Sequence, residues 1–288
     1  MRRVIASLAA LLAVTVSAIA VASAGALHAS GELYGLTDDN RLIGFTAANA
    51  GEIESNVKVS GLPAGASLIG IDVRPLDGML YTVAKVGTTG HLYTLSPETG
   101  RATFVTTLVA AGTTTPIALQ GTQFGFDFNP AADALRIVSD AGQNLRALPS
   151  SRAAGPVGTT FTDGPLNDAG TTAVGITAAG YTNNDNDAST GTTLYDIDSR
   201  LDRLAIQNPP NAGTLVRVGA LGVDTTNAAG FDIRTVGTSN IAYASLTEQQ
   251  GRGATLATLY QVDLATGAAT FLGKIGGPKT LIDIAAAA

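Results

Sequence analysis

The chain has 288 residues, of which 45% are hydrophobic and 14% charged, and it contains no cysteine, no tryptophan and two histidines. Disulfides, thiolate metal sites, cysteine nucleophiles and multi-histidine metal sites are therefore excluded within one chain. The net charge of −6 indicates no basic footprint for nucleic acid or for an anionic membrane surface.

The N-terminus has the pattern of an export signal. Two arginines follow the first methionine, residues 4–21 are mostly apolar, and Ala22-Ser23-Ala24 provides small residues for cleavage. We therefore predict a signal peptide over residues 1–24 and a secreted or periplasmic mature protein whose membrane contact is through this signal. The apolar run is close to the length that spans a bilayer, so an uncleaved anchor is the alternative. Residues 30–288 are predicted to form a single domain.

After the signal, short apolar segments alternate with turn residues. The first unit has three such segments, and the third alternates apolar and polar residues as a half-exposed strand does. They cover Leu33–Leu36, Leu42–Phe45 and Val57–Val59. The second unit has four, at Leu68–Arg74, Met79–Ala84, His91–Leu95 and Ala102–Leu108. By comparison, the first unit lacks its innermost strand.

The later units follow the same plan. The third has segments at 124–129, 134–139 and 144–148 with a weakly marked outer strand at 158–162, and the fourth opens at 173–182. The fifth unit repeats the outer half of the second closely, so we interpret the units as internal repeats. Two segments, 109–121 and 183–191, resist the pattern and are predicted to be loops.

The innermost segment of each unit has a recurring sequence. The copies are centred on Asp72, Asp127, Thr177, Asp232 and Asp283, which are 55, 50, 55 and 51 residues apart. A period near fifty residues is typical of a propeller, a solenoid or an array. The last copy has no unit of its own, and pairing it with the first unit would close a ring. We predict an all-β, five-bladed β-propeller with four antiparallel strands per blade, closed by pairing of the C-terminal strand with the N-terminal blade.

The aspartates of the inner strands are the candidate ligand-binding residues. They are Asp72, Asp127, Asp232 and Asp283, on one face of their strands near the predicted axis. The glycines of the same segments would let neighbouring backbones approach, and these are Gly70, Gly125, Gly175 and Gly230. Converging carboxylates could hold a hard cation such as Ca²⁺. The alternative, which we favour, is that each aspartate accepts backbone N–H groups from the next blade and pairs with Arg74 or Arg234.

Three further polar features have both a functional and a structural interpretation. The oxygen-rich run Asn183–Asp187 is similar in composition to a calcium loop but lacks EF-hand spacing, which favours a polar surface loop. His91 has no acid or nucleophile beside it in the sequence, which argues against catalysis. A third group forms either a binding patch or a hydrogen-bonded hairpin, and we favour the hairpin. It consists of Asp140, Gln143, Asn144 and Arg146, with Arg136 nearby.

Several stretches resemble a known family. They are Phe124–Pro130, Leu135–Arg146, Tyr181–Asn183, Thr193–Asp198, Gln207–Leu215 and Gly219–Asp224. In these stretches the chain is similar to the exported bacterial proteins of domain-of-unknown-function family 4394. The resemblance implies an exported, propeller-like bacterial domain. It brings no settled activity and therefore no catalytic residue or cofactor.

The sequence leaves three functions open. An extracellular binding or interaction module without enzymatic activity is favoured, because nothing in the pattern demands chemistry, and its partner would be an unknown extracellular ligand or protein. A propeller hydrolase that acts on a glycan or a lactone through axial aspartates is the alternative. It is weakened because all five glutamates lie outside the inner strands. The third is a structural protein stabilised by an axial metal ion.

Overall fold

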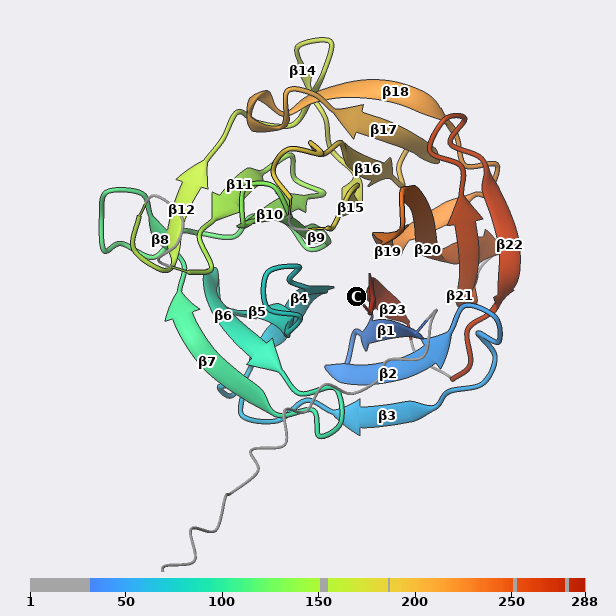
Figure 1. The fold of residues 1–288 in the computed structure, drawn as a ribbon, viewed down its shortest axis with the longest axis horizontal. Coiled ribbons are helices and arrows are strands. Elements are labelled where there is room, and N and C mark those ends of the chain that lie inside the picture. Colours follow the sequence, from blue (N-terminus) through green and yellow to red (C-terminus); the bar gives the residue numbers. More distant parts are fainter. Residues whose placement is uncertain (1–31, 151–154, 186, 251–252, 278–279, 288) are drawn as a thin grey trace, which may run out of the picture.

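Five β-sheets stand around a central axis, with the strands of each sheet ordered from the axis to the rim (Figure 1). This computed structural model describes residues 32–150, 155–185, 187–250, 253–277 and 280–287. The predicted signal peptide lies outside the described residues. In the described part of the chain, no helix is long and apolar enough to cross a membrane. The arrangement is that of a five-bladed β-propeller, which confirms the predicted fold.

Three blades have four antiparallel strands each, and we number the blades from the one that contains the first strand. From the axis outward, blade 1 contains β23 (Leu281–Ala286), β1 (Glu32–Thr37), β2 (Arg41–Thr46) and β3 (Ser55–Lys58). Blade 2 contains β4 (Ser67–Val73), β5 (Leu80–Val86), β6 (Thr89–Leu95) and β7 (Ala102–Thr107). Blade 5 contains β19 (Thr225–Val236), β20 (Ser239–Gln250), β21 (Gly253–Val262) and β22 (Ala269–Lys274).

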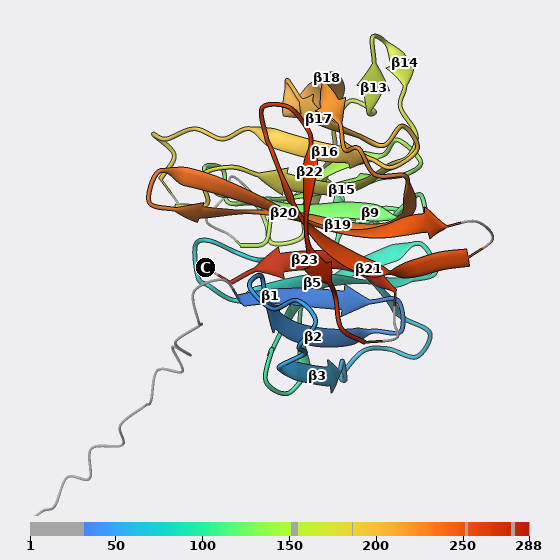
Figure 2. The ribbon, with the colours of Figure 1, turned by 90° about the vertical axis from the view of Figure 1, so that its right-hand side faces the viewer.

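Blades 3 and 4 carry additional short strands at the rim. Blade 3 contains β9 (Phe124–Asn129), β10 (Ala134–Ser139), β11 (Asn144–Ala147) and β12 (Thr159–Thr162), with β8 (Val109–Ala110) parallel to β12. Blade 4 contains β15 (Ile176–Tyr181), β16 (Leu194–Asp198), β17 (Arg203–Gln207) and β18 (Thr214–Ala220), with the 3₁₀ helix η1 (Pro210–Ala212) before β18. Parallel to β18 runs β13 (Asn167–Asp168), which forms a rim hairpin with β14 (Thr171–Thr172) (Figure 2).

The two predicted loops have different outcomes. The segment 109–121 is not entirely a loop, because it begins with β8, which extends the sheet of blade 3. Its parallel pairing covers an outer edge that short strands would otherwise leave open. In the segment 183–191, the described residues contain no strand, as predicted.

The C-terminal strand completes the first blade. β23 lies beside the axis and pairs antiparallel with β1, with Ala285 opposite Tyr34 (Figure 1). One face of this pair packs in a cluster with Leu259 of blade 5, and the other in a cluster with Ile71 of blade 2. The predicted closure by the C-terminal strand is confirmed, and the closing blade contacts both of its neighbours.

Each connection between blades is tied to the outer part of the blade that follows. Ser60, which follows blade 1, accepts the N–H of Ala102 on β7, and its own N–H donates to the carbonyl of Gly100. In the next two connections, β8 pairs with β12 of blade 3 and β13 pairs with β18 of blade 4. Leu221 accepts the N–H of Ala269 in blade 5. These hydrogen bonds join neighbouring blades at the rim.

The turn before an outer strand brings a glycine against the preceding blade. Gly100 has φ +68°, and a Cβ there would lie 2.5 Å from the carbonyl oxygen of Lys58. Gly267 has φ +81°, and its Cβ would lie 2.7 Å from the carbonyl oxygen of Gly219. Glycine is required at both positions by backbone conformation and by space.

Candidate functional site at the axis and its mouth

Equivalent positions on the five inner strands are identified by the residues opposite to them on the second strands. In four blades the opposite residue is a tyrosine, and in blade 3 it is an arginine. The pairs are Asp72–Tyr81, Gly180–Tyr195, Asp232–Tyr243, Ala285–Tyr34 and Asp127–Arg136. The ring of equivalent positions around the axis therefore contains three aspartates, a glycine and an alanine.

In blade 4 the ring position is Gly180, and the prediction of Thr177 was wrong. The stretch around Gly175 imitates the repeat, but Gly175 lies in the turn before β15 with φ +95°. Thr177 is buried and its hydroxyl donates to Ser199 Oγ over 3.0 Å. Gly175 therefore makes no close approach at the axis, whereas Gly180 would place a Cβ 3.0 Å from the ring of Phe231.

A signal that could have located Gly180 lies on the neighbouring strand. Tyr195 follows a leucine, just as Tyr34 follows Leu33 at the same place in blade 1. Aligning the second strands, rather than the inner ones, would have moved the ring position from Thr177 to Gly180. The inner strand of blade 4 has Gly180 at the ring position, so it lacks the aspartate by which the inner strands of the other units were compared.

Asp283 lies on the axial face, but two residues before the ring position of its strand. Its Oδ2 accepts the N–H of Ile71 over 2.9 Å, and the side chain is buried. A Cβ on Gly70 would lie 2.8 Å from this oxygen and 2.4 Å from Phe126 Cβ. The close approach predicted for Gly70 is therefore confirmed. Asp283 forms a separate level, so three carboxyl groups converge and not four.

Three carboxyl groups meet at the axis itself. One oxygen from each of Asp72, Asp127 and Asp232 lies within 4.8 Å of the others, and the three residues are at most 5% exposed. Each group accepts a backbone N–H from the blade that follows. The donors are Phe128 to Asp72 over 2.8 Å, Tyr181 to Asp127, and Ala286 to Asp232 over 2.5 Å. The predicted hydrogen bonds from the next blade are thus present at all three.

Burial and mutual repulsion change the acidity of these groups. Burial, followed by the charge of a neighbouring aspartate, raises the pKa of Asp72 and of Asp127 well above the usual range. Burial also raises the pKa of Asp232, which forms a side-chain hydrogen bond with Asp127. A hydrogen bond between two carboxyl groups requires that one of them carries the proton. At least one carboxyl group at the axis is therefore protonated.

The predicted ion pairs between axial aspartates and arginines are not formed. Arg74 follows Asp72 by two residues, at the end of the strand, where its long side chain reaches the turns instead of the axis. Its guanidinium pairs with Asp77 and Asp133, with N–O distances of 2.6 Å to each. Arg234 makes no ion pair with a ring aspartate in the described residues. Protons and backbone amides, not arginines, compensate the ring.

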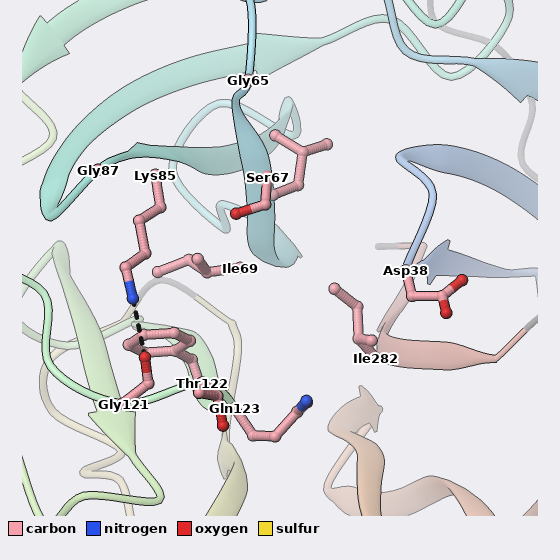
Figure 3. Close-up of a pocket in the computed structure, with 12 residues that line it drawn as sticks. Asp38, Gly65, Ser67, Ile69, Lys85, Gly87, Gly121, Thr122, Gln123 and Ile282 are labelled. Atoms are coloured by element: carbon pink, nitrogen blue, oxygen red, sulfur yellow. Dashed lines mark hydrogen bonds between the residues drawn. The ribbon is translucent and has the colours of Figure 1, made fainter.

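A cavity of about 360 Å³ opens at one end of the axis (Figure 3). Its wall comes from the start of β4, from Phe124 on β9, from Ile282 on β23 and from turns of blades 1, 2 and 3. The ring aspartates do not line it. Asp72 lies three residues beyond Ile69 of the wall, about 10 Å deeper along the strand.

Polar side chains at this mouth differ in how they are engaged. Lys85 Nζ donates to the carbonyl of Gly121 over 2.8 Å and lies 5.1 Å from the centre of the Phe124 ring (Figure 3). Thr122 Oγ1 donates to Asp140 Oδ2 over 2.6 Å. The polar side chains of the mouth that make no hydrogen bond with any described residue are those of Ser67, Gln123 and Asp38. The mouth thus offers a hydroxyl, an amide and a carboxylate beside the apolar side chains of Ile69 and Ile282.

The oxygen-rich run is a hydrogen-bonded loop against blade 5. The N–H of Asn183 donates to Asn240 Oδ1 over 2.9 Å, and that of Asn184 donates to Thr235 Oγ1 over 3.0 Å. Residue 186 lies outside the described residues. His91 is also engaged structurally, with Nδ1 3.0 Å from Thr107 Oγ1. These contacts favour the structural interpretation of both features.

The polar residues predicted to form a binding patch or a hairpin lie on β10, on β11 and in the turn between them. Asn144 is buried and accepts Nη1 of Arg136 over 2.7 Å. Asp140 and Gln143 hold the linker before β9 by accepting its backbone N–H groups. Arg146 remains partly exposed. All five residues belong to the hairpin of β10 and β11, in which Arg136 lies opposite Arg146 and the N–H of Ser139 donates to the carbonyl of Gln143. The predicted hydrogen-bonded hairpin is therefore confirmed.

Several solved structures are similar to this chain at low sequence identity. A protein from Lactobacillus plantarum is 14% identical, with 88% of this chain and 98% of that chain covered and a TM-score of 0.41. A chain of the nidogen/laminin complex is 12% identical, with 89% and 98% covered and a TM-score of 0.46. TolB from Acinetobacter baumannii is 14% identical, with 85% and 53% covered and a TM-score of 0.47. We draw no functional conclusion from these likenesses.

The sequence itself identifies the family. No curated protein matches the chain. Residues 41–285 match a family described as a domain of unknown function, DUF4394, and this range spans all five blades. The match extends from the second strand of blade 1 to the strand that closes the ring. The chain therefore belongs to the DUF4394 family of domains of unknown function.

Proposed function

We propose that the protein is an exported β-propeller that binds a small ligand at the mouth of its axis and has no enzymatic activity. The observation that carries the proposal is the cavity of about 360 Å³, a size suited to a small molecule, with polar side chains that have no partner among the described residues. The N-terminal sequence pattern supports export. The binding site is distinct from the buried aspartates.

The lining chemistry favours an uncharged, hydroxyl-rich ligand of sugar size. Ser67 and the amide of Gln123 both donate and accept hydrogen bonds, and Asp38 accepts them. Lys85, the cation of the wall, is engaged with a carbonyl oxygen and an aromatic ring. The net charge of −6 also disfavours anions. The side chains of Ile69 and Ile282 would contact the apolar face of a sugar ring.

The hydrolase alternative has less support. A glycosidase needs two carboxyl groups that reach the substrate from different environments. Asp72, Asp127 and Asp232 lie below the cavity, are at most 5% exposed and accept backbone N–H groups. Asp38 is the carboxylate of the cavity wall. A binding site fits this distribution better than a catalytic one.

Ligand titration with matched variants tests the proposal. Neutral sugars and polyols, with sugar phosphates for comparison, are titrated into the protein by calorimetry, and thermal shift is recorded in parallel. Ser67→Phe fills the mouth from an exposed position. Ser239→Phe adds the same ring at the exposed start of β20, which lies at the opposite end of the inner strand of blade 5. We expect neutral ligands to bind the wild type and Ser239→Phe, and Ser67→Phe to lose binding.

Two results would contradict the proposal. Equal binding to Ser67→Phe and the wild type would place the ligand elsewhere. If the wild type converted a bound compound to a product and Ser67→Phe lost this activity, the protein would be an enzyme. Export is tested separately by determining the N-terminus of the mature protein, which should begin at Gly25. Retention of residues 1–24 would favour the membrane anchor instead.

A further inference from the structure

The contact between blades 3 and 4 contains a carboxyl group without a partner. Asp196 on β16 is fully buried, and neither of its oxygens has a hydrogen-bond donor among the described residues. The residues beside it on the adjacent strands are Ala179 of β15 and Ala205 of β17, which have no polar side chain. An ionised carboxylate in such surroundings has lost its water without gaining a hydrogen bond.

The nearby charges do not supply a counter-ion at contact distance. A negative charge on Asp196 would be attracted by Arg136 of blade 3 and repelled by Asp198. However, Arg136 forms no ion pair with Asp196 among the described residues. Every guanidinium nitrogen of Arg136 already donates to another acceptor. The acceptors are Tyr181 Oη at 3.3 Å, Asn144 Oδ1 at 2.7 Å, Asp163 Oδ2 at 2.8 Å and Asn211 Oδ1 at 2.8 Å. Asp198 in turn pairs with Arg203 at 3.1 Å.

The same side of blade 4 contains a second unpaired acceptor. Gln207 lies two residues after Ala205 on β17, so the side chains of these two residues are on the same face of the strand. Ala205 is the residue opposite Asp196. Its Oε1 is buried and has no donor in the described residues, while its amide nitrogen donates to the carbonyl of Pro210. The region therefore has an excess of acceptors. A proton on Asp196 converts one acceptor into a donor.

We propose that Asp196 binds a proton that holds blades 3 and 4 together, and that release of this proton loosens their contact. Burial raises the pKa of Asp196 to about 8, which agrees with the geometry. Once ionised, Asp196 attracts Arg136 and competes with Asp163 and Asn211 for it. Those two residues lie in the segments after β12 and at η1, where the N–H of Gly164 donates to the carbonyl of Asn211 over 2.8 Å.

Urea unfolding of Asp196→Asn and of the wild type as a function of pH tests the proton. Between about pH 4 and about pH 8, folded wild type keeps a proton that the unfolded chain releases, so its stability falls as the pH rises. Asparagine does not titrate. The unfolding constant of the wild type, divided by that of the variant, should therefore rise up to about tenfold per pH unit and level off above about pH 8. A ratio independent of pH would overturn the proposal.

Two further variants separate titration from packing. The serine of Asp196→Ser is also neutral, but it fills the site less well. The unfolding constant of the wild type, divided by that of Asp196→Ser, must show the same pH dependence as for Asp196→Asn, because a packing defect does not change with pH. Asp224→Asn removes an exposed aspartate, and its unfolding constant should keep a fixed ratio to that of the wild type. If Asp224→Asn reproduces the pH dependence of Asp196→Asn, the proposal fails.

Hydrogen exchange locates the loosening. We expect the amides of residues 158–164 and 208–215 to lose protection between pH 7 and pH 9 in the wild type, after correction for intrinsic rates, and to keep it in Asp196→Asn. Equal protection of the wild type at both pH values would show that the proton does not hold this contact. Neither experiment depends on the ligand proposed for the mouth.

Discussion

At the scale of single residues, the axis is defined by acids that cannot all be charged. The carboxyl oxygens of Asp72, Asp127 and Asp232 lie within 4.8 Å of one another in a site at most 5% exposed. Each accepts a backbone N–H, but these bonds offset only part of the cost of burying three like charges. The hydrogen bond between Asp127 and Asp232 removes one of the charges by placing a proton between them.

We expect Asp127→Asn to stabilise the protein at neutral pH and to have little effect in acid. Burial and the charge of Asp72 raise the pKa of Asp127 well above its ordinary value of 3.8, so folded protein retains a proton that the unfolded chain releases. Stability contributed by this proton is complete below about pH 4 and is lost as the pH rises towards the folded pKa. The advantage of the variant should grow by up to about 1.4 kcal/mol per pH unit. Urea unfolding across this range measures it.

A bound cation would give the opposite result. If Ca²⁺ occupied the ring, the purified protein would contain one equivalent of metal, EDTA would lower its Tm, and Asp127→Asn would destabilise it at neutral pH. Elemental analysis and melting with and without EDTA distinguish the two cases. We expect no change in Tm with EDTA, and any of the three cation results would contradict the shared proton.

At the scale of elements, neighbouring blades meet at the turn that precedes an outer strand. The turn glycine approaches a carbonyl oxygen of the previous blade, and the connecting segment then hydrogen-bonds to the outer part of the same blade. Gly100 and Gly267 show this arrangement in blades 2 and 5. A tight turn within one blade therefore also determines how closely two blades pack at the rim.

Two glycines with the same backbone conformation separate these effects. Gly78 and Gly100 both have φ +68°, but a Cβ on Gly78 would meet nothing within 4 Å, whereas one on Gly100 would lie 2.5 Å from the Lys58 carbonyl oxygen. We expect Gly78→Ala to cost about 1 kcal/mol for the left-handed conformation. Gly100→Ala should cost roughly 1 to 3 kcal/mol more, because backbone must move. Equal losses in chemical denaturation would show that the contact between blades is unimportant.

Most elements could be predicted from the sequence, whereas the site could be predicted only in part. Strands and turns repeat with local signals, and the lone last strand indicated closure. The ring position of blade 4 was missed because Gly180 replaces the aspartate and the stretch near Gly175 imitates the motif. The cavity was not foreseen, because its wall comes from turns of several blades that are distant in sequence. Contacts such as Arg74–Asp133 depend on the same long-range geometry.

At the scale of the whole molecule, stability depends on one pairing between distant parts of the chain. β23 supplies the inner strand of blade 1, and Leu281 and Ile284 are at most 2% exposed. Its backbone also supplies the N–H of Ala286 to Asp232, and its Asp283 accepts the N–H of Ile71. The strand therefore contributes to the core of blade 1 and to the axis at the same time.

Removal of residues 280–288 should prevent stable folding. Loss of each large buried side chain costs about 2 to 5 kcal/mol, and a domain has about 5 to 15 kcal/mol in total. A synthetic peptide of residues 280–288 should restore a cooperative thermal transition when added to the shortened protein. The same peptide with Ile284→Asp should not, because it would bury an unpaired charge. Cooperative unfolding of the shortened protein without peptide would contradict this dependence.

The pairing of β1 with β23 also limits how early the ring can close during synthesis of the chain. More than 240 residues separate the end of β1 from the start of β23, so at about 5 to 20 residues per second a ribosome needs roughly 10 to 50 s to deliver the partner of a strand made at the outset. During that interval β1 is an unpaired edge that any other extended chain could occupy. For the exported protein proposed above, this delay has a benefit. Under the proposed export, a chain that cannot close its ring before β23 is made would reach the translocation pore without a completed propeller.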